Sequence, residues 1–221
     1  MTVTVDRPWV EFDLGEEMRV LSWAISRPGL VRARRILWRE VRNADLPADL
    51  DVYDWLGAEL AARDASDAVC FLTSRDVRAV TQAHASVGQA VALAVATTGL
   101  SNAERVGTRF PRDPSVWGTI NVAVQLNIGL TEPALLEAIS IASQARTAAV
   151  MEIGLHLPTG QATGTGTDCI AIAAPDGAEP YAGLHTEVGH ALGKAVYDAV
   201  LQGAQEWMVS PGAAGPGLSF R

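Results

Sequence analysis

The segment VWGTINVAVQLN, residues 116–127, constrains the fold most strongly, because apolar and polar residues alternate along it with the period of a β-strand. One face carries the apolar side chains of Ile120, Val122, Val124 and Leu126. The other face carries the hydroxyl and amide groups of Thr119, Asn121, Gln125 and Asn127, with Ala123 among them. We expect the apolar face to fix the strand in the core, whereas alternation alone leaves open what the hydroxyl and amide groups of the polar face contact.

Strand-like and helix-like segments follow one another in runs. Strands are expected at 10–14, 17–26, 30–41, 67–74, within 77–99, at 116–127 and at 169–174. Helices are expected at 51–64, at 130–154 with Thr131 as N-cap, and at 184–208 with Thr186 as N-cap, and a loop is expected at 101–116. This order indicates the α+β class: a single domain over 1–209, in which helices pack on a largely antiparallel sheet, and a flexible tail at 210–221.

The composition favours a large buried core and argues against several kinds of partner. Of the 221 residues, 48% are hydrophobic and 19% are charged, so disorder is not expected. The formal net charge of −8 argues against a nucleic-acid partner, which needs a basic surface. No apolar run is long enough to span a membrane, and the N-terminus lacks the apolar stretch of a signal peptide.

The two cysteines, Cys70 and Cys169, lie in apolar runs without a disulfide pattern. We expect buried free thiols and therefore a protein of the reducing cytoplasm. Helices rich in small residues and exposed sheet edges are compatible with a homodimer.

The glycine-rich segment ATGTGTD, residues 162–168, has two interpretations. Nucleotide binding is not expected, because the segment lacks the Lys-Ser/Thr ending of a phosphate loop and precedes a strand instead of a helix. The segment is then either a simple turn or a pocket wall. The side chains that would line the pocket are those of Thr163, Thr165, Thr167 and Asp168.

The segment HTEVGH, residues 185–190, contains side-chain types that bind metals. Its two histidines are five residues apart, so they point away from one another on a helix, and no further ligands cluster nearby in the sequence. An N-capped helix start with an acid in its first turn explains the same residues. No protein-bound metal is therefore expected.

Asn102 and Thr119 each admit a structural and a chemical interpretation. Asn102 either forms an Asx turn or donates its amide to a developing oxyanion. Thr119 either begins a strand or acts as a nucleophile, with a base that takes its proton. Backbone cleavage after Gly118 would supply that base, because it frees the α-amino group of Thr119.

Four segments together resemble the adenosylcobinamide amidohydrolase family of corrinoid salvage. They are VATTGLSNAERVG, WGTINVAVQLNIGLTEPALLEAISIASQARTAAVMEIG, ATGTGTDCIAIAAP and YAGLHTEVGHALGKAVYDAV, which lie between Val95 and Val200. The resemblance implies hydrolysis of the amide bond that joins the aminopropanol arm, or the nucleotide loop, to an adenosylated corrinoid, with adenosylcobyric acid as product. It implies no cofactor, because the cobalt belongs to the corrinoid substrate.

The order of these segments is also similar to that of self-processing β-aminopeptidases and ornithine acetyltransferases. This likeness implies Thr119 as nucleophile, Asn102 in the oxyanion hole, and Asp168 in substrate positioning or proton transfer. The residues expected to bind substrate are Asn121, Gln125, Thr163, Thr165, Thr167, His185, Thr186 and Glu187. Two further hypotheses place His185 near the corrin or its cobalt, and use tryptophans as a flat wall for the ring.

Two other functions remain open on the sequence. One is a corrinoid-binding or carrier protein without catalysis. The other is a self-processing aminopeptidase or acyltransferase that acts on small amino acid derivatives.

Overall fold

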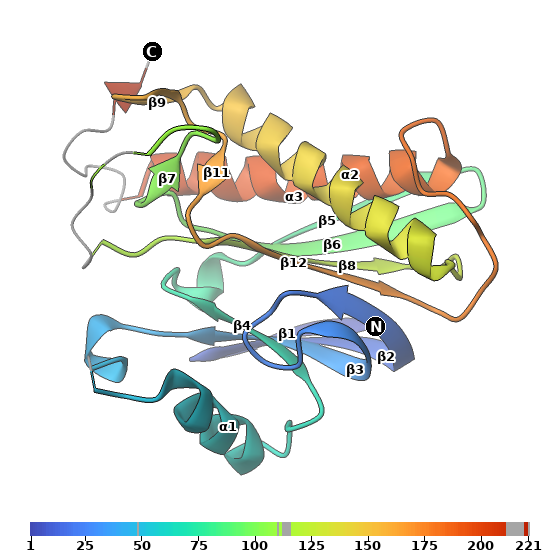
Figure 1. Cartoon of the computed structure of the whole chain (residues 1–221), viewed down its shortest axis with the longest axis horizontal. Helices are drawn as coiled ribbons and strands as arrows, with labels where there is room; N and C mark the ends of the chain where they lie inside the picture. Colours follow the sequence, from blue (N-terminus) through green and yellow to red (C-terminus); the bar gives the residue numbers. More distant parts are fainter. Residues whose placement is uncertain (48, 110, 112–115, 211–218, 221) are drawn as a thin grey trace.

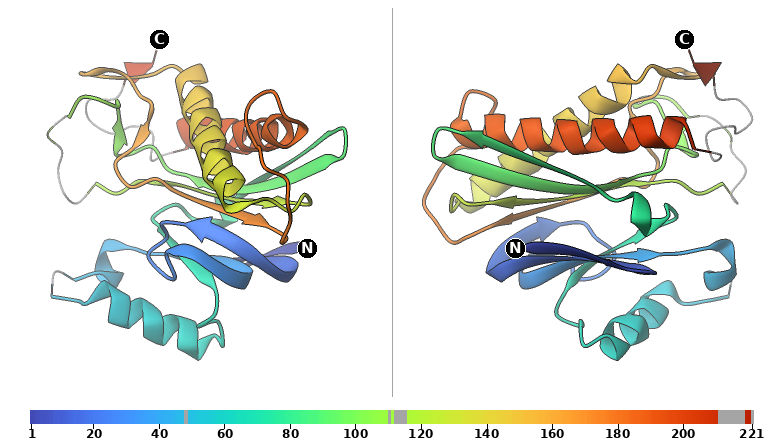
Figure 2. Two further views of the ribbon diagram at one scale, coloured as in Figure 1. Left: turned by 45° about the vertical axis from the view of Figure 1, so that its right-hand side comes forward. Right: turned by 180° about the vertical axis from the view of Figure 1, so that it is seen from behind.

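The computed structural model describes residues 1–47, 49–109, 111, 116–210 and 219–220. Within these ranges the chain builds four layers (Figure 1). Two helices, α2 (Glu132–Glu152) and α3 (Glu187–Met208), cover one half of the sheet, and α1 (Val52–Ala62) covers the other half from the opposite side. The two halves of the sheet pack face to face between these helical layers (Figure 2).

The large sheet has eight strands in the order β4-β3-β2-β12-β8-β6-β5, with β1 paired to β2. Its strands are β1 (Thr2–Asp6), β2 (Trp9–Ser22), β3 (Gly29–Glu40), β4 (Val69–Thr73), β5 (Thr81–Val87), β6 (Ala90–Thr98), β8 (Ile120–Leu126) and β12 (Cys169–Ala174). The β3–β4 and β8–β12 pairs run parallel, and the other neighbours run antiparallel. The α+β class with a largely antiparallel sheet is therefore confirmed.

Short elements complete the fold among the described residues. They are the 3-10 turns at Asn43–Asp45 and Val77–Ala79 and the strands β7 (Ala103–Glu104), β9 (Leu155–Leu157), β10 (Gly160–Gln161), β11 (Gly164–Thr165) and β13 (Ser219–Phe220). Most of the tail predicted at 210–221 lies outside the described residues, and β13 pairs with β9. No helix in the described ranges is long and apolar enough to cross a membrane.

Strand β8 is buried on both faces, and this differs from the expectation of one core face and one pocket face. Its apolar face packs under α2 and α3, as expected. Its other face lies between the two halves of the sheet, where Ala123 joins a second core cluster. The alternation is therefore confirmed, but the polar face reaches the Thr119 cavity only at the start of the strand, and Gln125 near its end lines a separate cavity.

The predicted helix caps are confirmed. The Thr131 hydroxyl accepts the N–H of Ala134, and the Thr186 hydroxyl accepts the N–H of Gly189. Each cap satisfies one of the backbone donors that a helix start leaves unpaired. Both cysteines are buried free thiols, as predicted.

The loops that follow β8 and β12 cross at Gly129 and Gly177. A Cβ atom on Gly177 would lie 2.2 Å from the carbonyl oxygen of Gly129, a backbone atom that cannot swing aside. These two loops lead into α2 and α3, so their contact determines how both helices reach the sheet. Only glycine permits this approach.

We predict that Gly177→Ala lowers the free energy of unfolding by about 2–4 kcal/mol, because the new methyl group forces the crossing loops apart. Gly57 in α1 is the matched control, since a Cβ there meets nothing within 4 Å. Gly57→Ala should raise the free energy of unfolding by about 0.5–1 kcal/mol through helix propensity. Chemical denaturation measures both, and equal effects of the two substitutions would contradict the crossing-loop account.

Candidate active site

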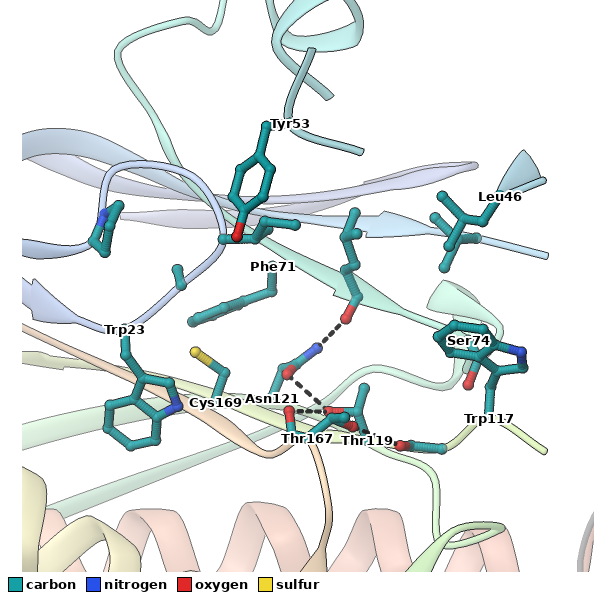
Figure 3. A pocket seen from close by; sticks show the side chains of 16 residues that line it. Trp23, Leu46, Tyr53, Phe71, Ser74, Trp117, Thr119, Asn121, Thr167 and Cys169 are labelled. Carbon is teal, nitrogen blue, oxygen red and sulfur yellow. Dashed lines mark hydrogen bonds between the residues drawn. The ribbon is translucent and has the colours of Figure 1, made fainter. Parts of the chain in front are cut away.

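A cavity of about 500 Å³ lies where the start of β8 meets the N-terminal half of the sheet (Figure 3). Its polar lining includes Thr119, Asn121 and Thr167, which lie close together. Aromatic side chains form much of the remaining wall: Trp23, Tyr53, Phe71 and Trp117. None of the described residues that line the cavity carries a charged side chain.

The Thr119 hydroxyl lies on the cavity floor beside two hydrogen-bond acceptors. Its Oγ1 lies 2.9 Å from the carbonyl oxygen of Thr167 and 3.2 Å from Oδ1 of Asn121, and it donates its proton toward these acceptors. Among the described residues, no amine, imidazole or carboxylate forms a hydrogen bond with this hydroxyl. Its lone pairs therefore remain available, but attack requires a base that the uncut chain does not place there.

Asn121 lies two residues further along the same face of β8 and holds this hydroxyl in position. Its Nδ2 donates to the carbonyl oxygen of Leu72 at 2.7 Å, which links β8 to β4 across the cavity. Its Oδ1 is thereby left to accept from Thr119. Because the side chain is 99% buried, loss of either bond would leave an unsatisfied polar group.

The turn after β6 lies directly against the Gly118–Thr119 peptide. The N–H of Gly99 donates to the Thr119 carbonyl at 2.9 Å. A Cβ on Gly118 would lie 2.8 Å from Oδ1 of Asn102 and 2.9 Å from the backbone of Gly99 and Ser101. Asn102 therefore contacts the residue before Thr119, and its buried Oδ1 has no hydrogen-bond partner within the described part of the chain.

Asp168 anchors the start of β8 from the glycine-rich loop. Its carboxylate accepts the N–H of Ile120 at 3.0 Å and the N–H of Thr165 at 2.9 Å, and it pairs with Arg146 of α2. Burial raises the pKa of the Asp168 carboxyl, whereas Arg146 and the Thr165 and Ile120 donors oppose that shift. The side chain thus ties together β8, α2 and the loop, and it contacts the cavity only through its neighbours.

The same loop also holds the backbone around Thr119. The Thr167 hydroxyl donates to the carbonyl oxygen of Gly118 at 3.0 Å. The indole Nε1 of Trp23 donates to the Asp168 carbonyl at 3.0 Å, so one cavity wall is tied to the loop. The two bonds of Thr167, to the Gly118 carbonyl and from the Thr119 hydroxyl, fix these groups relative to each other, whereas the Trp23 bond holds only the cavity wall.

Cys169 lines the same cavity and is the other conceivable nucleophile. Burial raises the pKa of its thiol to about 12, and the weak contact with Ser22 acts in the opposite direction. Since the thiolate is the reactive form, Cys169 remains an inert thiol at neutral pH. Thr119 is therefore the better candidate nucleophile.

The structure brings only part of the predicted set into this cavity. Thr119, Asn121 and Thr167 line it. Thr163, Thr165 and Asp168 line an adjoining polar cavity of about 370 Å³ together with Arg146, and Val106 donates its N–H to the Thr163 hydroxyl. The glycine-rich segment is thus divided between two cavities instead of forming one wall.

Gln125 does not face the Thr119 cavity, which corrects the expectation that it lies in one pocket with Thr119 and Asn121. Its Nε2 donates to the carbonyl oxygen of Leu14 at 2.8 Å, and it lines a separate cavity at the far end of β8. Gln125 is four residues along the strand from Asn121, a separation of about 13 Å. The carboxamide links the two halves of the sheet instead of contacting a substrate beside Thr119.

His185, Thr186 and Glu187 also lie away from Thr119, contrary to the expectation that they bind the same substrate. Glu187 accepts the N–H of Gln89, and Gln89 in turn accepts from Asn127 at the far end of β8. Asn127 is eight residues along the chain from Thr119, a separation of roughly 26 Å in an extended strand. His185 and Thr186 line a different cavity beside α2, and that His185 approaches the corrin stays a prediction.

Sequence reasoning did not single out several side chains of the site. It proposed tryptophans as a flat wall without saying which, and the structure gives this place to Trp23 and Trp117, beside Phe71 of β4. Arg146 lies in an alanine-rich helix and gave no motif. Trp117 was identifiable in principle, since it directly precedes the Gly118–Thr119 pair.

No three His, Cys, Asp or Glu side chains of the described ranges gather closely enough to hold a metal ion.

A candidate nucleophilic hydroxyl on the floor of a cavity without charged side chains defines a site suited to acyl transfer. Residues 1–211 match the CbiZ family, described as adenosylcobinamide amidohydrolase. The chain therefore belongs to the adenosylcobinamide amidohydrolase family, and the match includes the N-terminal strands.

Two individual proteins are also similar to the chain. Over 89 residues it is 37% identical to the uncharacterized protein MJ1613 of Methanocaldococcus jannaschii, a stretch that spans 38% of the chain and 35% of that relative. The PH0078 protein from Pyrococcus horikoshii OT3 has a solved structure with a TM-score of 0.49 and 11% identity. That alignment covers 90% of this chain and 77% of the other.

We predict that Gly118→Ala reduces activity at least about 100-fold, because the methyl group displaces the Asn102 turn or the Thr119 strand start. Gly166 in the glycine-rich loop is the control, since a Cβ there meets nothing within 4 Å. Steady-state kinetics of Gly118→Ala and Gly166→Ala measure the difference. Full activity of Gly118→Ala would show that catalysis does not depend on the close contact between Gly118 and the Asn102 turn.

We further predict that Cys169 resists iodoacetamide in the folded protein. With a thiol pKa of about 12, only about one thiol in ten thousand is ionised at pH 8. Mass spectrometry should find Cys169 unmodified at pH 8 in buffer and modified in denaturant. Rapid alkylation of Cys169 in the native protein would show that its thiol is reactive and would make it a candidate nucleophile again.

Proposed function

We propose that the protein hydrolyses the amide that joins the aminopropanol arm, or the nucleotide loop, to an adenosylated corrinoid. The products would be adenosylcobyric acid and the released amine, for use in cobalamin salvage. The observation that carries the proposal is the Thr119 hydroxyl on the floor of a cavity without charged lining residues. Family membership supports the substrate class.

The uncharged lining favours a corrinoid amide over the alternative of a small aminopeptidase substrate. A free amino acid derivative carries an ammonium or carboxylate group, and a buried charge needs a partner of opposite sign. No side chain among the described residues of this cavity offers such a partner. An amide arm on a large ring instead presents neutral donors and acceptors, which Asn121, Thr167 and Ser74 match in kind.

In the proposed reaction, Oγ1 of Thr119 attacks the amide carbonyl carbon of the substrate. The tetrahedral intermediate then expels the arm as an amine, which takes up a proton, and leaves an ester on Thr119. Water hydrolyses the ester, releases the corrinoid carboxylate and restores the hydroxyl. The Thr167 and Asn121 acceptors hold Oγ1 in position before attack.

The base in this proposal is the α-amino group of Thr119, freed by cleavage after Gly118. In the uncut chain, Oγ1 of Thr119 would attack the Gly118 carbonyl carbon while its proton passes through a water molecule to the leaving peptide nitrogen. Water would then hydrolyse the resulting ester to a Gly118 carboxylate and the free Thr119 hydroxyl. The Thr167 hydroxyl already donates to the Gly118 oxygen, where negative charge would develop. Gly118 lines the cavity and Asn102, which contacts Gly118, does not. If the new C-terminus at Gly118 moved away after cleavage, Asn102 would become accessible to a substrate.

A product assay with adenosylcobinamide tests the proposal. Thr119→Ala should lose at least about 1000-fold in kcat, Asn102→Ala about 100-fold, and Thr119→Ser should retain measurable turnover as the conservative control. Aminopropanol release and adenosylcobyric acid formation are both measured. Full turnover in Thr119→Ala would overturn the assignment of the nucleophile, and binding without turnover in the wild type would indicate a carrier.

Intact-mass measurement tests the cleavage separately. The purified protein should yield fragments 1–118 and 119–221, and Thr167→Val should slow their appearance because the Gly118 carbonyl loses its donor. Thr119→Ala should stay uncut. A single uncut chain with full activity would refute the amine as the base.

A further inference from the structure

The tryptophans of this chain are distributed unevenly between core and surface. Trp9, Trp38 and Trp207 are buried, and Trp55 is half-buried under the guanidinium of Arg39. Trp23 and Trp117 are each 48% exposed, and both line the Thr119 cavity. Exposed indoles gathered at a single cavity mark a binding surface, because large apolar side chains otherwise avoid water.

A hydrogen bond holds the Trp23 indole, and the start of β8 holds the backbone of Trp117. The Nε1 of Trp23 donates to the Asp168 carbonyl at 3.0 Å, which restrains the ring while leaving half of it exposed. Trp117 is two residues before Thr119, so its backbone is continuous with the strand start. Figure 3 shows the two indoles on opposite sides of Thr119 and Asn121, with Tyr53 above the cavity. Little side-chain freedom would be lost when a flat ligand binds.

The size of the cavity decides which part of a corrinoid can enter it. About 500 Å³ suits a drug-sized molecule. A corrin ring with its amide arms and an adenosyl group is considerably larger. If the scissile amide is to reach Thr119, one arm enters the cavity and the ring remains at the mouth, where the exposed aromatic side chains lie.

We infer that Trp23 and Trp117 form a platform for the corrin ring and thereby determine which amide reaches Thr119. This inference rests on the proposed function, since it assumes a corrinoid substrate. The indole faces contact the flat conjugated ring and the edges of its arms. The platform contributes to ring binding and does not take part in bond breaking.

The test measures adenosylcobinamide affinity by equilibrium dialysis in a Thr119→Ala background, where turnover is removed. Trp23→Ala and Trp117→Ala should each raise Kd about tenfold, and Trp23→Phe and Trp117→Phe should stay within about threefold. Trp55→Ala is the matched control, because Trp55 lies in α1 and does not line the cavity. Thermal unfolding confirms that each variant is folded.

Steady-state kinetics in the otherwise wild-type protein supply a second measurement. The two alanine variants should raise KM about tenfold and change kcat less than about threefold. Kd values equal to that of Trp55→Ala would overturn the platform. A fall in kcat with unchanged KM would overturn it as well.

The wild-type protein separates failure of this inference from failure of the proposed function. If it binds adenosylcobinamide but releases no aminopropanol, the hydrolysis is refuted, and the dialysis of the tryptophan variants still decides the platform. If it binds no corrinoid, both are overturned. If it hydrolyses the corrinoid while the alanine variants bind it unchanged, only the platform is overturned.

Discussion

The carboxylate of Asp168 is the constraint on which the candidate site depends. It is buried beside the start of β8, where it accepts the backbone N–H of Ile120 and pairs with Arg146. A buried carboxylate is tolerated only with such donors, and its partners come from a strand, a helix and a loop. The position of Thr119, one residue before Ile120, therefore depends on three separate elements.

The layered fold explains why a cavity forms at this end of the strand. Strand β8 is covered by helices on one face and by the N-terminal half of the sheet on the other. Along most of its length both faces are filled, and the polar groups of Gln125 are used for structure. At Thr119 the packing between the two halves of the sheet ends, and side chains of both halves line the open space.

The sequence predicted the elements well, because their signals are local. Alternation at 116–127, the caps Thr131 and Thr186, and the apolar runs around the cysteines each depend on neighbouring residues, and each matches the structure. It also placed Asn102 and Thr119 as candidates, and the structure puts Asn102 against the residue before Thr119. Their chemical roles stay predictions.

Sequence reasoning failed where the answer depends on packing between distant segments. Gln125 shares a strand face with Thr119 but meets Leu14 from the other half of the sheet. Glu187 and His185 belong to a conspicuous motif, yet their helix begins near the far end of β8. Trp23 and Arg146 reach the site from separate segments, and no local pattern carries that information.

The central claim is that Thr119 forms a covalent bond with the corrinoid during amide hydrolysis. Rapid acid quench of the protein with adenosylcobinamide, followed by peptide mass spectrometry, measures this bond directly. The account predicts an adenosylcobyric acid ester on the hydroxyl of Thr119 that forms before the steady state and is absent from Thr119→Ala. Product formation with an ester on another residue, or with undiminished rate in Thr119→Ala, would contradict it.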